Sequence, residues 1–480
     1  MDKNRLNVLF AVWELEPFLK VGGLGEVARS LPIALKSLGV DIRLIIPDYR
    51  ALKTYGQRKT DVAILHVPYG KQRLRVTIHK INSLDIDIPV YLVGNHHYLD
   101  TPIPETFPVF NAAIIEALSK QIFHDWKPHI LHCNDNHCGF LPLLCKIRKI
   151  PVKTLLTIHC ISHQRKFSQK EAQKLHIPYK DLSLVRWETK NRQFNMLYEG
   201  IIHADWINTV SPTYLKEIQT EEGVAGLDEV IRKYSNKISA ILNGIDYTLK
   251  NPETNMELAA RYSVKQELVV KDTSVIDPVI GKRKNKIILQ KRLGLPLSEG
   301  IPVIGFIGRM DPRQKGIELI HRMIVRQKEK HCQYVIMGQG DELWEERFQK
   351  LHAFYPNRVA VVTAYNDALA PFIYAGSDFM MIPSHFEPCC LIQMHAMRYG
   401  AIPIVRETGG LTDTVIDGKN GFVFTSPTSF ELERTILKAI RIKRAHPKRF
   451  AQMVKAAMNR DFSWNESAKQ YLDVYKRITS

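Results

Sequence analysis

Short apolar runs rich in β-branched residues alternate with amphipathic stretches along most of the chain. Helical periodicity fills the intervals, for example at residues 26–38, 110–123 and 194–203. The apolar runs lack regular polar alternation, as is typical of parallel strands that helices cover on both faces. The pattern therefore predicts a doubly wound α/β domain. Its expected strands are residues 7–12, 41–46, 89–93, 130–133, 154–159 and 206–210.

The same alternation returns in the second half of the chain after an interruption. Residues 246–285 are polar and weakly periodic, which indicates a linker. We therefore expect two Rossmann-like domains, residues 1–245 and 286–480, with the last helix packing back toward the first domain. A ligand of such a protein is expected outside the carboxyl ends of the strands, in a central cleft that the two domains face. The expected strands of the second domain are residues 303–308, 333–337, 359–363, 379–382 and 402–405.

Composition excludes several protein classes. Apolar residues make up 45% of the 480 residues and charged residues 24%, which is ordinary globular usage and excludes a disordered chain. No apolar run reaches the roughly 18 residues that a membrane-spanning helix needs, and the first residues do not form a secretory signal. The seven cysteines have irregular spacing, as expected for reduced thiols. We expect a cytoplasmic protein without a membrane partner.

The chain carries a surplus of positive charge. Lysine and arginine total 67, aspartate and glutamate 49, and the formal net charge is +18. Such a surplus suits a nucleic-acid binder or an enzyme for anionic substrates. The sequence has no zinc-finger spacing, aromatic RNA-binding motif or basic tail, so we expect no nucleic-acid partner. The densest basic stretch, residues 282–286, is interpreted as a solvated face of the linker.

Two glycine pairs occupy corresponding places in the two halves. Gly22 and Gly23 follow Lys20 before a predicted helix, and Gly409 and Gly410 follow Thr408 in the second half. Paired glycines let the backbone approach a ligand closely, and a helix N-terminus offers free N–H groups to an anion. Each pair alone is compatible with a plain turn. Together they indicate a diphosphate site.

Charged residues follow two strands of the second half. Arg309 and Lys315 come after the strand at residues 303–308, where they could neutralise a departing nucleotide diphosphate. Glu387, before Pro388, follows the strand at residues 379–382 and could accept sugar hydroxyls. The alternatives are surface ion pairs for the cations and a helix-capping acid for Glu387.

A metal site is not favoured. His132, Cys133, His137 and Cys138 are of the types that bind zinc. However, a strand sends adjacent side chains to opposite faces, so His132 and Cys133 would diverge. His159 ends another strand, where a structural histidine is the default interpretation.

The motifs in this order resemble those of the glycogen and starch synthases, retaining glucosyltransferases with the two-domain GT-B fold. The resemblance runs nearly end to end. It implies transfer of glucose from ADP-glucose to an α-glucan such as glycogen or a malto-oligosaccharide, with ADP released and no metal or cofactor required. The matching segments are residues 20–24, 157–159, 210–214, 241–246, 387–400 and 408–415.

The resemblance also implies roles for individual residues. The catalytic group would be His159, Arg309, Lys315 and Glu387. The acceptor side would include Asp135, Asn136 and His137. The donor and its nucleotide would be bound by Lys20, Gly22, Gly23, Asn243, Tyr365, Cys389, Cys390, Leu391, Thr408, Gly409 and Gly410.

Departures from the family pattern lie mainly on the acceptor side. Asn136 stands where the family has tryptophan, Cys160 where it has asparagine and Tyr198 where lysine is frequent. Near the donor, Cys390 stands where the family has glycine. Two alternatives to a glycogen synthase therefore stay open. One is a glucosyltransferase with a different acceptor, and the other is a catalytically silent protein that binds glucan or a nucleotide sugar.

Overall fold

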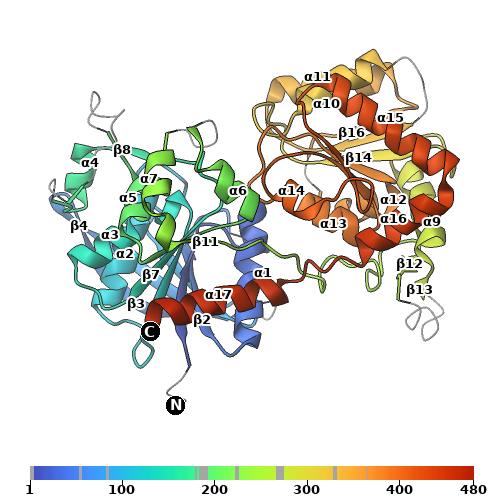
Figure 1. Cartoon of the computed structure of the whole chain (residues 1–480). Coiled ribbons are helices and arrows are strands. Elements are labelled where there is room, and N and C mark those ends of the chain that lie inside the picture. Colours follow the sequence, from blue (N-terminus) through green and yellow to red (C-terminus); the bar gives the residue numbers. More distant parts are fainter. Residues whose placement is uncertain are drawn as a thin grey trace. The chain divides into compact units, whose positions relative to one another are not determined.

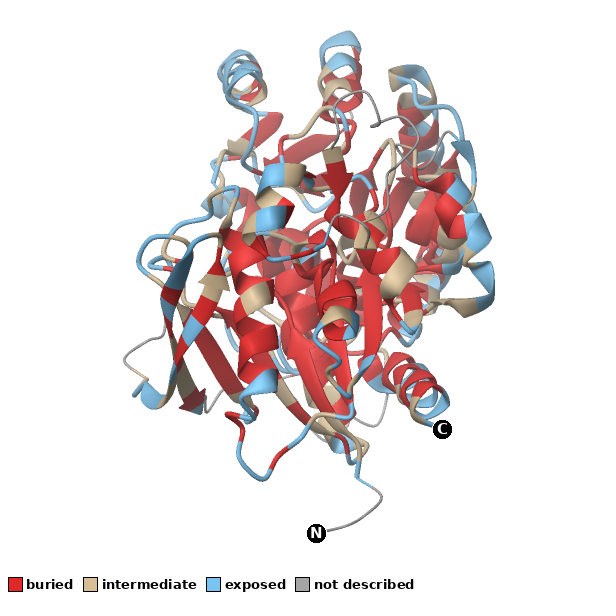
Figure 2. Cartoon of the chain, turned by 90° about the vertical axis from the view of Figure 1, so that its left-hand side faces the viewer, coloured by how far each residue is buried: buried red, intermediate tan, exposed pale blue. Residues whose placement is uncertain are grey.

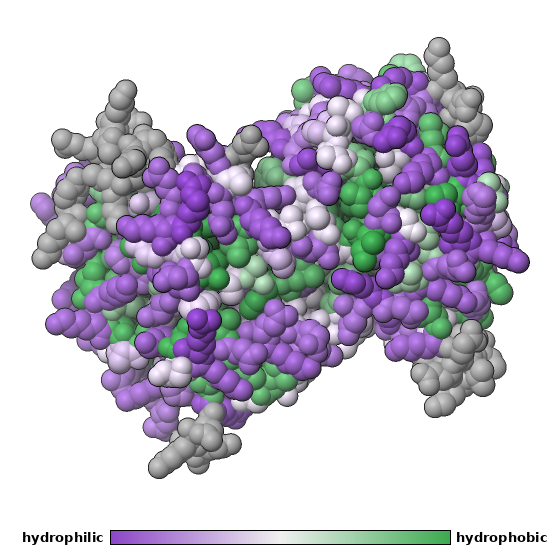
Figure 3. Space-filling view, in the orientation of Figure 1, coloured by the Kyte–Doolittle hydropathy of each residue, from purple (hydrophilic) through white to green (hydrophobic). Residues whose placement is uncertain are grey.

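The computed structural model describes residues 5–52, 57–82, 86–178, 181–182, 193–221, 226–265, 275–327, 332–364 and 366–480. The chain divides into two compact units (Figure 1). The first comprises Met1–Gly244 with Trp464–Ser480, and the second comprises Ile245–Ser463. In these described ranges, no helix combines the length and apolar character needed to cross a bilayer. Hydrophilic side chains cover most of the face seen in Figure 3.

The first unit is built on a mixed sheet. Its described pairings are parallel except for those of β3 with β4 and of β4 with β5, which are antiparallel, so that β4 runs against the other strands. The described strands lie in the order β11 (Ile238–Ala240), β10 (Trp206–Thr209), β7 (Lys153–Ile158), β6 (Ile130–Asn134), β1 (Asn7–Ala11), β2 (Asp41–Pro47), β5 (Pro89–Gly94), β4 (Gln72–Asn82) and β3 (Thr60–Tyr69). The six strands expected in this half are present. The antiparallel pair β3 and β4 was not predicted.

Helices cover both faces of this sheet, and the strand residues alternate between them. On β1, Val8 and Phe10 join an apolar core with α1 and α17, whereas Leu9 and Ala11 join a separate core with α2, α3 and α5. The strands at the centre of the unit are accordingly buried (Figure 2). The helices are α1 (Gly23–Ser37), α2 (Thr106–Ser119), α3 (Leu141–Ile147), α4 (Gln169–Lys174), α5 (Met196–His203), α6 (Pro212–Glu217), α7 (Asp228–Lys233) and α17 (Trp464–Thr479), beside a small pair of strands, β8 (Lys166–Ser168) and β9 (Gln193–Asn195).

The C-terminal helix belongs to the first unit. It lies beside α1 (Figure 1). The hydroxyl of Tyr475 on α17 is 2.8 Å from Nδ1 of His132 on β6, and Asn208 on β10 donates to the hydroxyl of Tyr471 at 2.9 Å. These buried hydrogen bonds attach the end of the chain to the middle of the first sheet.

The second unit has a six-stranded sheet in which every described pairing is parallel. The strand order corresponds to 3-2-1-4-5-6, the order of a doubly wound nucleotide-binding fold. The strands are β16 (Val359–Val362), β15 (Gln333–Met337), β14 (Val303–Ile307), β17 (Phe379–Ile382), β18 (Ile402–Arg406) and β19 (Phe422–Phe424). The helices are α9 (Pro278–Arg292), α10 (Ile317–Arg326), α11 (Glu342–Phe354), α12 (Ala370–Gly376), α13 (Ile392–Arg398), α14 (Gly409–Thr414), α15 (Ser429–Ala445) and α16 (Pro447–Met458).

The strand order of each sheet reverses beside its first strand. In the second unit, β14 has β15 on one side and β17 on the other, and in the first unit β1 lies between β2 and β6. At such a switch point the loops after adjacent strands diverge to opposite faces and leave room for a ligand. The loops after β14 and β17, and those after β1 and β6, are therefore where a site is expected.

Residues 246–285, for which we expected a linker, are grouped with the second unit. Arg398 on α13 donates to Asn251 Oδ1 and Glu253 Oε2, both at 2.8 Å, and the hydroxyl of Tyr262 donates to the Tyr399 carbonyl at 2.8 Å. The short strands β12 (Arg261–Tyr262) and β13 (Val275–Ile276) and the start of α9 lie in this segment. The segment thus buries polar side chains that are hydrogen-bonded to α13 and to the residue after it, which a search for apolar periodicity does not detect.

The interpretation of the basic stretch as solvated surface is wrong for two of its lysines. Lys282 and Lys286 on α9 are buried. Lys282 Nζ donates to the carbonyls of Tyr374, Ala375 and Tyr399 at 3.0–3.1 Å, and burial lowers the pKa of this ammonium to about 7. Lys286 Nζ lies 2.6 Å from Asp378 Oδ2. These two lysines therefore bind polar groups inside the second unit and are not part of a solvated surface.

Candidate active site

The switch point of the second unit brings a lysine and a glutamate together. Lys315 is on the β14 loop (residues 308–316) and Glu387 is on the β17 loop (residues 383–391). Lys315 Nζ donates to Glu387 Oε2 at 2.7 Å, and Ser384 Oγ donates to the same oxygen at 3.0 Å. Burial lowers the pKa of Lys315, but the attraction of Glu387 outweighs it, so the pKa is raised. The ammonium group of Lys315 and the carboxylate of Glu387 thus hold each other in place.

Glycines allow the loops at this edge to approach one another. Gly316 has φ +62°, and a Cβ there would lie 2.1 Å from the carbonyl oxygen of Pro383. A Cβ on Gly410, after β18, would lie 2.4 Å from the carbonyl oxygen of Cys389. Gly410 N also donates to the Glu387 carbonyl at 3.2 Å. Larger residues at either glycine would push the loops that carry Lys315 and Glu387 apart.

Apart from Tyr365, the other residues predicted for the second half lie on the loops that follow β14, β17 and β18. Arg309 is on the β14 loop, where its Nη2 donates to Gln314 Oε1 at 2.5 Å. Tyr365 lies outside the described residues. The remaining predicted positions are on the β17 loop and at the start of α14, namely Cys389, Cys390, Leu391, Thr408, Gly409 and Gly410.

Arg406 on β18 was not predicted and stabilises the β17 loop. Its Nε donates to the Ser384 carbonyl at 2.8 Å, and its Nη2 donates to the His385 carbonyl. The sequence offered one indication of this role, because Arg406 directly follows the apolar strand expected at residues 402–405. Arg406 ties the loop that bears Glu387 to the neighbouring strand.

In the first unit, the loop after β1 is organised around a buried carboxylate. Glu14 is 2% exposed, and its Oε2 accepts from the backbone N–H groups of Val21 at 2.6 Å and Gly22 at 3.0 Å. Burial raises the pKa of Glu14. Lys20 Nζ pairs with Glu16 at 3.0 Å and Glu26 at 3.6 Å. Sequence reasoning predicted Lys20, Gly22 and Gly23 here but missed the role of Glu14.

Asp135, directly after β6, has a backbone conformation that favours glycine. Its φ of 60° and ψ of −172° lie in a region that costs a side-chain-bearing residue roughly 1–3 kcal/mol. Its Oδ1 accepts from the N–H groups of His159 at 3.1 Å and Cys160 at 3.3 Å. Burial raises the pKa of this carboxyl to about 7. The carboxyl joins the ends of β6 and β7.

His159 is a neutral imidazole. Burial lowers its pKa to about 3. Its Nε2 lies 3.0 Å from Asn134 Oδ1 and, facing an acceptor, carries the proton, so that Nδ1 keeps a lone pair. Asn243 is also buried, and among the described residues its Oδ1 has no hydrogen-bond donor. A buried amide oxygen without a hydrogen-bond donor lowers the stability of the folded protein by about 1–3 kcal/mol. This cost favours a ligand that donates a hydrogen bond to Asn243.

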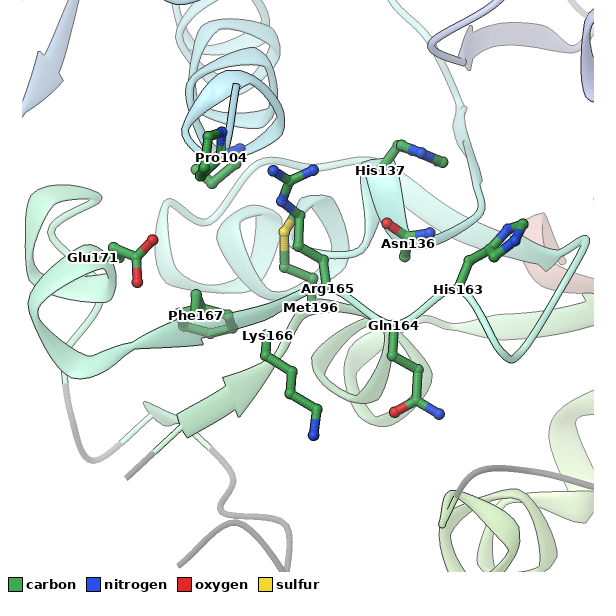
Figure 4. A pocket seen from close by; sticks show the side chains of 11 residues that line it. Pro104, Asn136, His137, His163, Gln164, Arg165, Lys166, Phe167, Glu171 and Met196 are labelled. Carbon is green, nitrogen blue, oxygen red and sulfur yellow. The ribbon is translucent and has the colours of Figure 1, made fainter. Parts of the chain in front are cut away.

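The remaining predicted residues, Asn136 and His137, line a cavity of about 500 Å³ in the first unit (Figure 4). The His137 ring stacks on Trp13 with centroids 4.7 Å apart, and burial lowers its pKa well below the usual value. The cavity therefore has a rigid aromatic wall beside Asn136.

In the described part of the chain, no group of three or more histidine, cysteine, aspartate or glutamate residues is arranged to hold a metal ion. His132 Nε2 is 2.8 Å from Thr157 Oγ1, and Cys138 Sγ contacts the Ala11 carbonyl oxygen at 3.4 Å. These contacts give both residues structural partners.

Comparison with known proteins matches both halves of the chain. Residues 7–233 match the starch synthase catalytic domain, and residues 290–459 match the glycosyl transferases group 1. A glycogen synthase 2 from Nitrosococcus oceani is 36% identical and aligns over 98% of this chain and 97% of its own length. A glycogen synthase from Cellvibrio japonicus is 36% identical over 99% of this chain and 100% of its own length.

The chain belongs to the glycogen synthase family. The structure of the catalytic domain of starch synthase IV from Arabidopsis thaliana, bound to ADP and acarbose, has a TM-score of 0.89 at 29% identity, covering 99% of each chain. A sucrose-phosphate synthase from Thermosynechococcus elongatus has a TM-score of 0.62 at 18% identity, covering 99% of each chain, a likeness of fold alone. The predictions of a GT-B fold and of a glycosyltransferase of the glycogen synthase type are confirmed.

Against the glycogen synthase pattern, Cys390 is the departure with a clear backbone consequence. Its φ is +61°, a conformation suited to the glycine of the family motif. Burial raises the pKa of its thiol to about 12, so the thiol stays protonated. Both Lys315 and Glu387 are close enough to influence this pKa. A side chain therefore occupies space beside the ion pair that the family motif leaves empty.

Replacing Cys390 should relieve this strain. We expect Cys390→Gly to raise the stability of the protein by up to about 1 kcal/mol, because a left-handed residue with a Cβ costs about that much. Differential scanning calorimetry measures the shift in unfolding temperature. Cys389→Gly is the matched control, since Cys389 is buried and does not have a positive φ, and it should lower stability. A lower unfolding temperature for Cys390→Gly would contradict the assignment of strain.

Asp135 should make stability depend on pH. Because its folded pKa of about 7 exceeds the usual value near 4, its ionisation destabilises the folded state progressively as the pH rises from about 4 to about 7. Asp135→Asn keeps an Oδ1 for both N–H groups and removes the charge. The variant should therefore gain unfolding temperature over the wild type at pH 8 and gain little at pH 4.5. If the unfolding temperatures of the variant and the wild type differed by the same amount at both pH values, Asp135 would ionise normally in the folded protein.

Proposed function

We propose that this glycogen synthase family member transfers glucose from ADP-glucose to the non-reducing end of an α-1,4-glucan. The observation that carries the proposal is the Lys315–Glu387 pair at the switch point of the second sheet, in a chain related to glycogen synthases along its whole length. The solved structure of starch synthase IV bound to ADP and acarbose supports a nucleotide donor and a glucan-like acceptor.

In the proposed reaction, the glycosidic C1–O bond to the β-phosphate breaks and the acceptor hydroxyl oxygen bonds to C1 on the same face. The hydroxyl proton goes to the departing phosphate oxygen, and the product keeps the α configuration. Arg309 and Lys315 would neutralise the developing charge on ADP, so that no metal is required. Glu387 would accept hydrogen bonds from glucose hydroxyls. Its Oε2 already accepts from Lys315 and Ser384, which holds it as an acceptor and not as a nucleophile.

The first unit carries groups that suit sugar hydroxyls. The neutral His159 can hydrogen-bond a glucose hydroxyl without adding a positive charge of its own. The Asn243 side-chain oxygen, which has no donor among the described residues, can accept a hydrogen bond. The cavity beside Asn136 favours a second candidate function, transfer to an acceptor other than plain glycogen, because the acceptor-side tryptophan of the family is replaced there.

Transfer of radiolabelled glucose from ADP-glucose to glycogen, with UDP-glucose in parallel, tests the proposal. Lys315→Ala should lower turnover by roughly 100-fold or more and also weaken ADP-glucose binding, because its charge matters most as the diphosphate leaves. Glu387→Ala should abolish detectable labelling. Lys284→Ala is the control, since Lys284 is an exposed lysine of the same unit.

Two results would count against the proposal. Unchanged turnover in Glu387→Ala would remove that carboxylate from the site. Binding of ADP-glucose without transfer to any glucan or small sugar would indicate a silent binder.

A further inference from the structure

The cavity of the first unit is formed by four separate parts of the chain (Figure 4). They are residues 104–108 at the start of α2, the turn at residues 136–137, residues 163–171 around β8, and Met196 at the start of α5. Its volume of about 500 Å³ is in the range of roughly 300–1,000 Å³ typical of small-molecule sites. Polar and apolar side chains share the lining, so a sugar with a charged substituent fits its chemistry.

Arg165 lines this cavity and is held in position by residues next to it. Its guanidinium lies over the Phe107 ring, 4.8 Å from the centroid, and Phe107 is in edge contact with His137 at 4.5 Å. Arg165 Nη2 donates to the Ile103 carbonyl at 3.2 Å. Figure 4 shows its guanidinium in the middle of the lining residues, whereas the Lys166 side chain points the other way. The guanidinium is thus oriented before any ligand arrives.

Among the residues that the structure describes, Arg165 forms no ion pair with a carboxylate, although it is partly buried. The acid on the cavity wall, Glu171, is engaged with its own helix: its Oε2 accepts from Ser168 N at 2.6 Å and Ser168 Oγ at 2.7 Å. Nearby, Glu105 pairs with Lys174 at 3.7 Å. Glu171 and Glu105 therefore attract Arg165 only at longer range, and its guanidinium N–H groups that face the cavity have no carboxylate within ion-pair distance among the described residues.

We propose that this cavity binds a phosphate monoester carried by a sugar, with Arg165 as the anion-binding group, and that the natural form is a phosphorylated glucosyl unit of the acceptor. The proposal rests on the proposed function, because it takes the acceptor to be a glucan. A guanidinium matches the planar pair of oxygens of a phosphate better than a single hydroxyl, and its fixed position limits the entropy lost on binding. Asn136, in place of a bulky tryptophan, lines the same cavity.

Binding of defined dextrins to the full-length protein tests this inference. The probes are phosphorylated malto-oligosaccharides before and after phosphatase treatment, with free glucose 6-phosphate as a third probe, all measured by isothermal titration calorimetry. The wild type should bind the phosphorylated dextrin at least tenfold more tightly than the dephosphorylated one. Arg165→Met should lose this preference and keep the affinity for the neutral dextrin.

Two further variants make the result specific. Arg165→Lys keeps the charge but not the planar pair of donors, so it should retain only part of the preference. Arg73→Met removes an exposed arginine of the same unit and should change nothing. If Arg165→Met does not fold, as judged by its unfolding transition, the inference is tested by whether Arg165→Lys loses part of the preference for the phosphorylated dextrin.

Equal wild-type affinity for the two dextrins, or a preference that survives in Arg165→Met, would overturn the inference. Binding of glucose 6-phosphate as tight as that of the phosphodextrin, and lost in Arg165→Met, would support the phosphate site but overturn the assignment to the acceptor chain. Failure of the proposed function is a separate outcome, namely no glucosyl transfer to any glucan, phosphorylated or neutral.

Discussion

The parallel pairing of β14 with β17 is the contact on which the candidate donor site depends. It places two loops side by side at the switch point, and Gly316 lets the β14 loop lie against the Pro383 carbonyl oxygen. Gly410 brings the start of α14 against Cys389. Lys315 and Glu387 meet because these backbones are closer than a Cβ would permit. The charge arrangement is therefore a consequence of backbone packing.

The first unit uses buried carboxylates for the same purpose. Glu14 accepts hydrogen bonds from the N–H groups of Val21 and Gly22. Asp135 accepts hydrogen bonds from those of His159 and Cys160. Burial raises the pKa of both acids, so their positions are held at a cost in stability. Strained or destabilised groups at strand ends are common where a fold positions chemistry. Both units thus fix their site loops at the switch points, one with glycines and the other with acids.

The sequence predicted the sheets well because buried parallel strands and their helices leave a strong pattern. It missed β3 and β4, whose half-exposed antiparallel pairing lacks that pattern. It misjudged Lys282 and Lys286, since charge alone cannot reveal the buried carbonyls that accept from Lys282 or the buried Asp378 that pairs with Lys286. Motif positions such as Lys315 and Glu387 were found, but the ion pair between them was not. Arg165 was missed because it matched no motif and its neighbours are distant in sequence.

Calorimetric binding of ADP-glucose to Gly410→Ala tests most directly whether close backbone packing creates the donor site. The control is Gly300→Ala, because a Cβ on Gly300 would meet no atom within 4 Å. Our account predicts at least a tenfold loss of affinity in Gly410→Ala, in a protein whose unfolding transition is retained, and wild-type affinity in Gly300→Ala. Wild-type affinity in Gly410→Ala would show that the donor site does not depend on this packing.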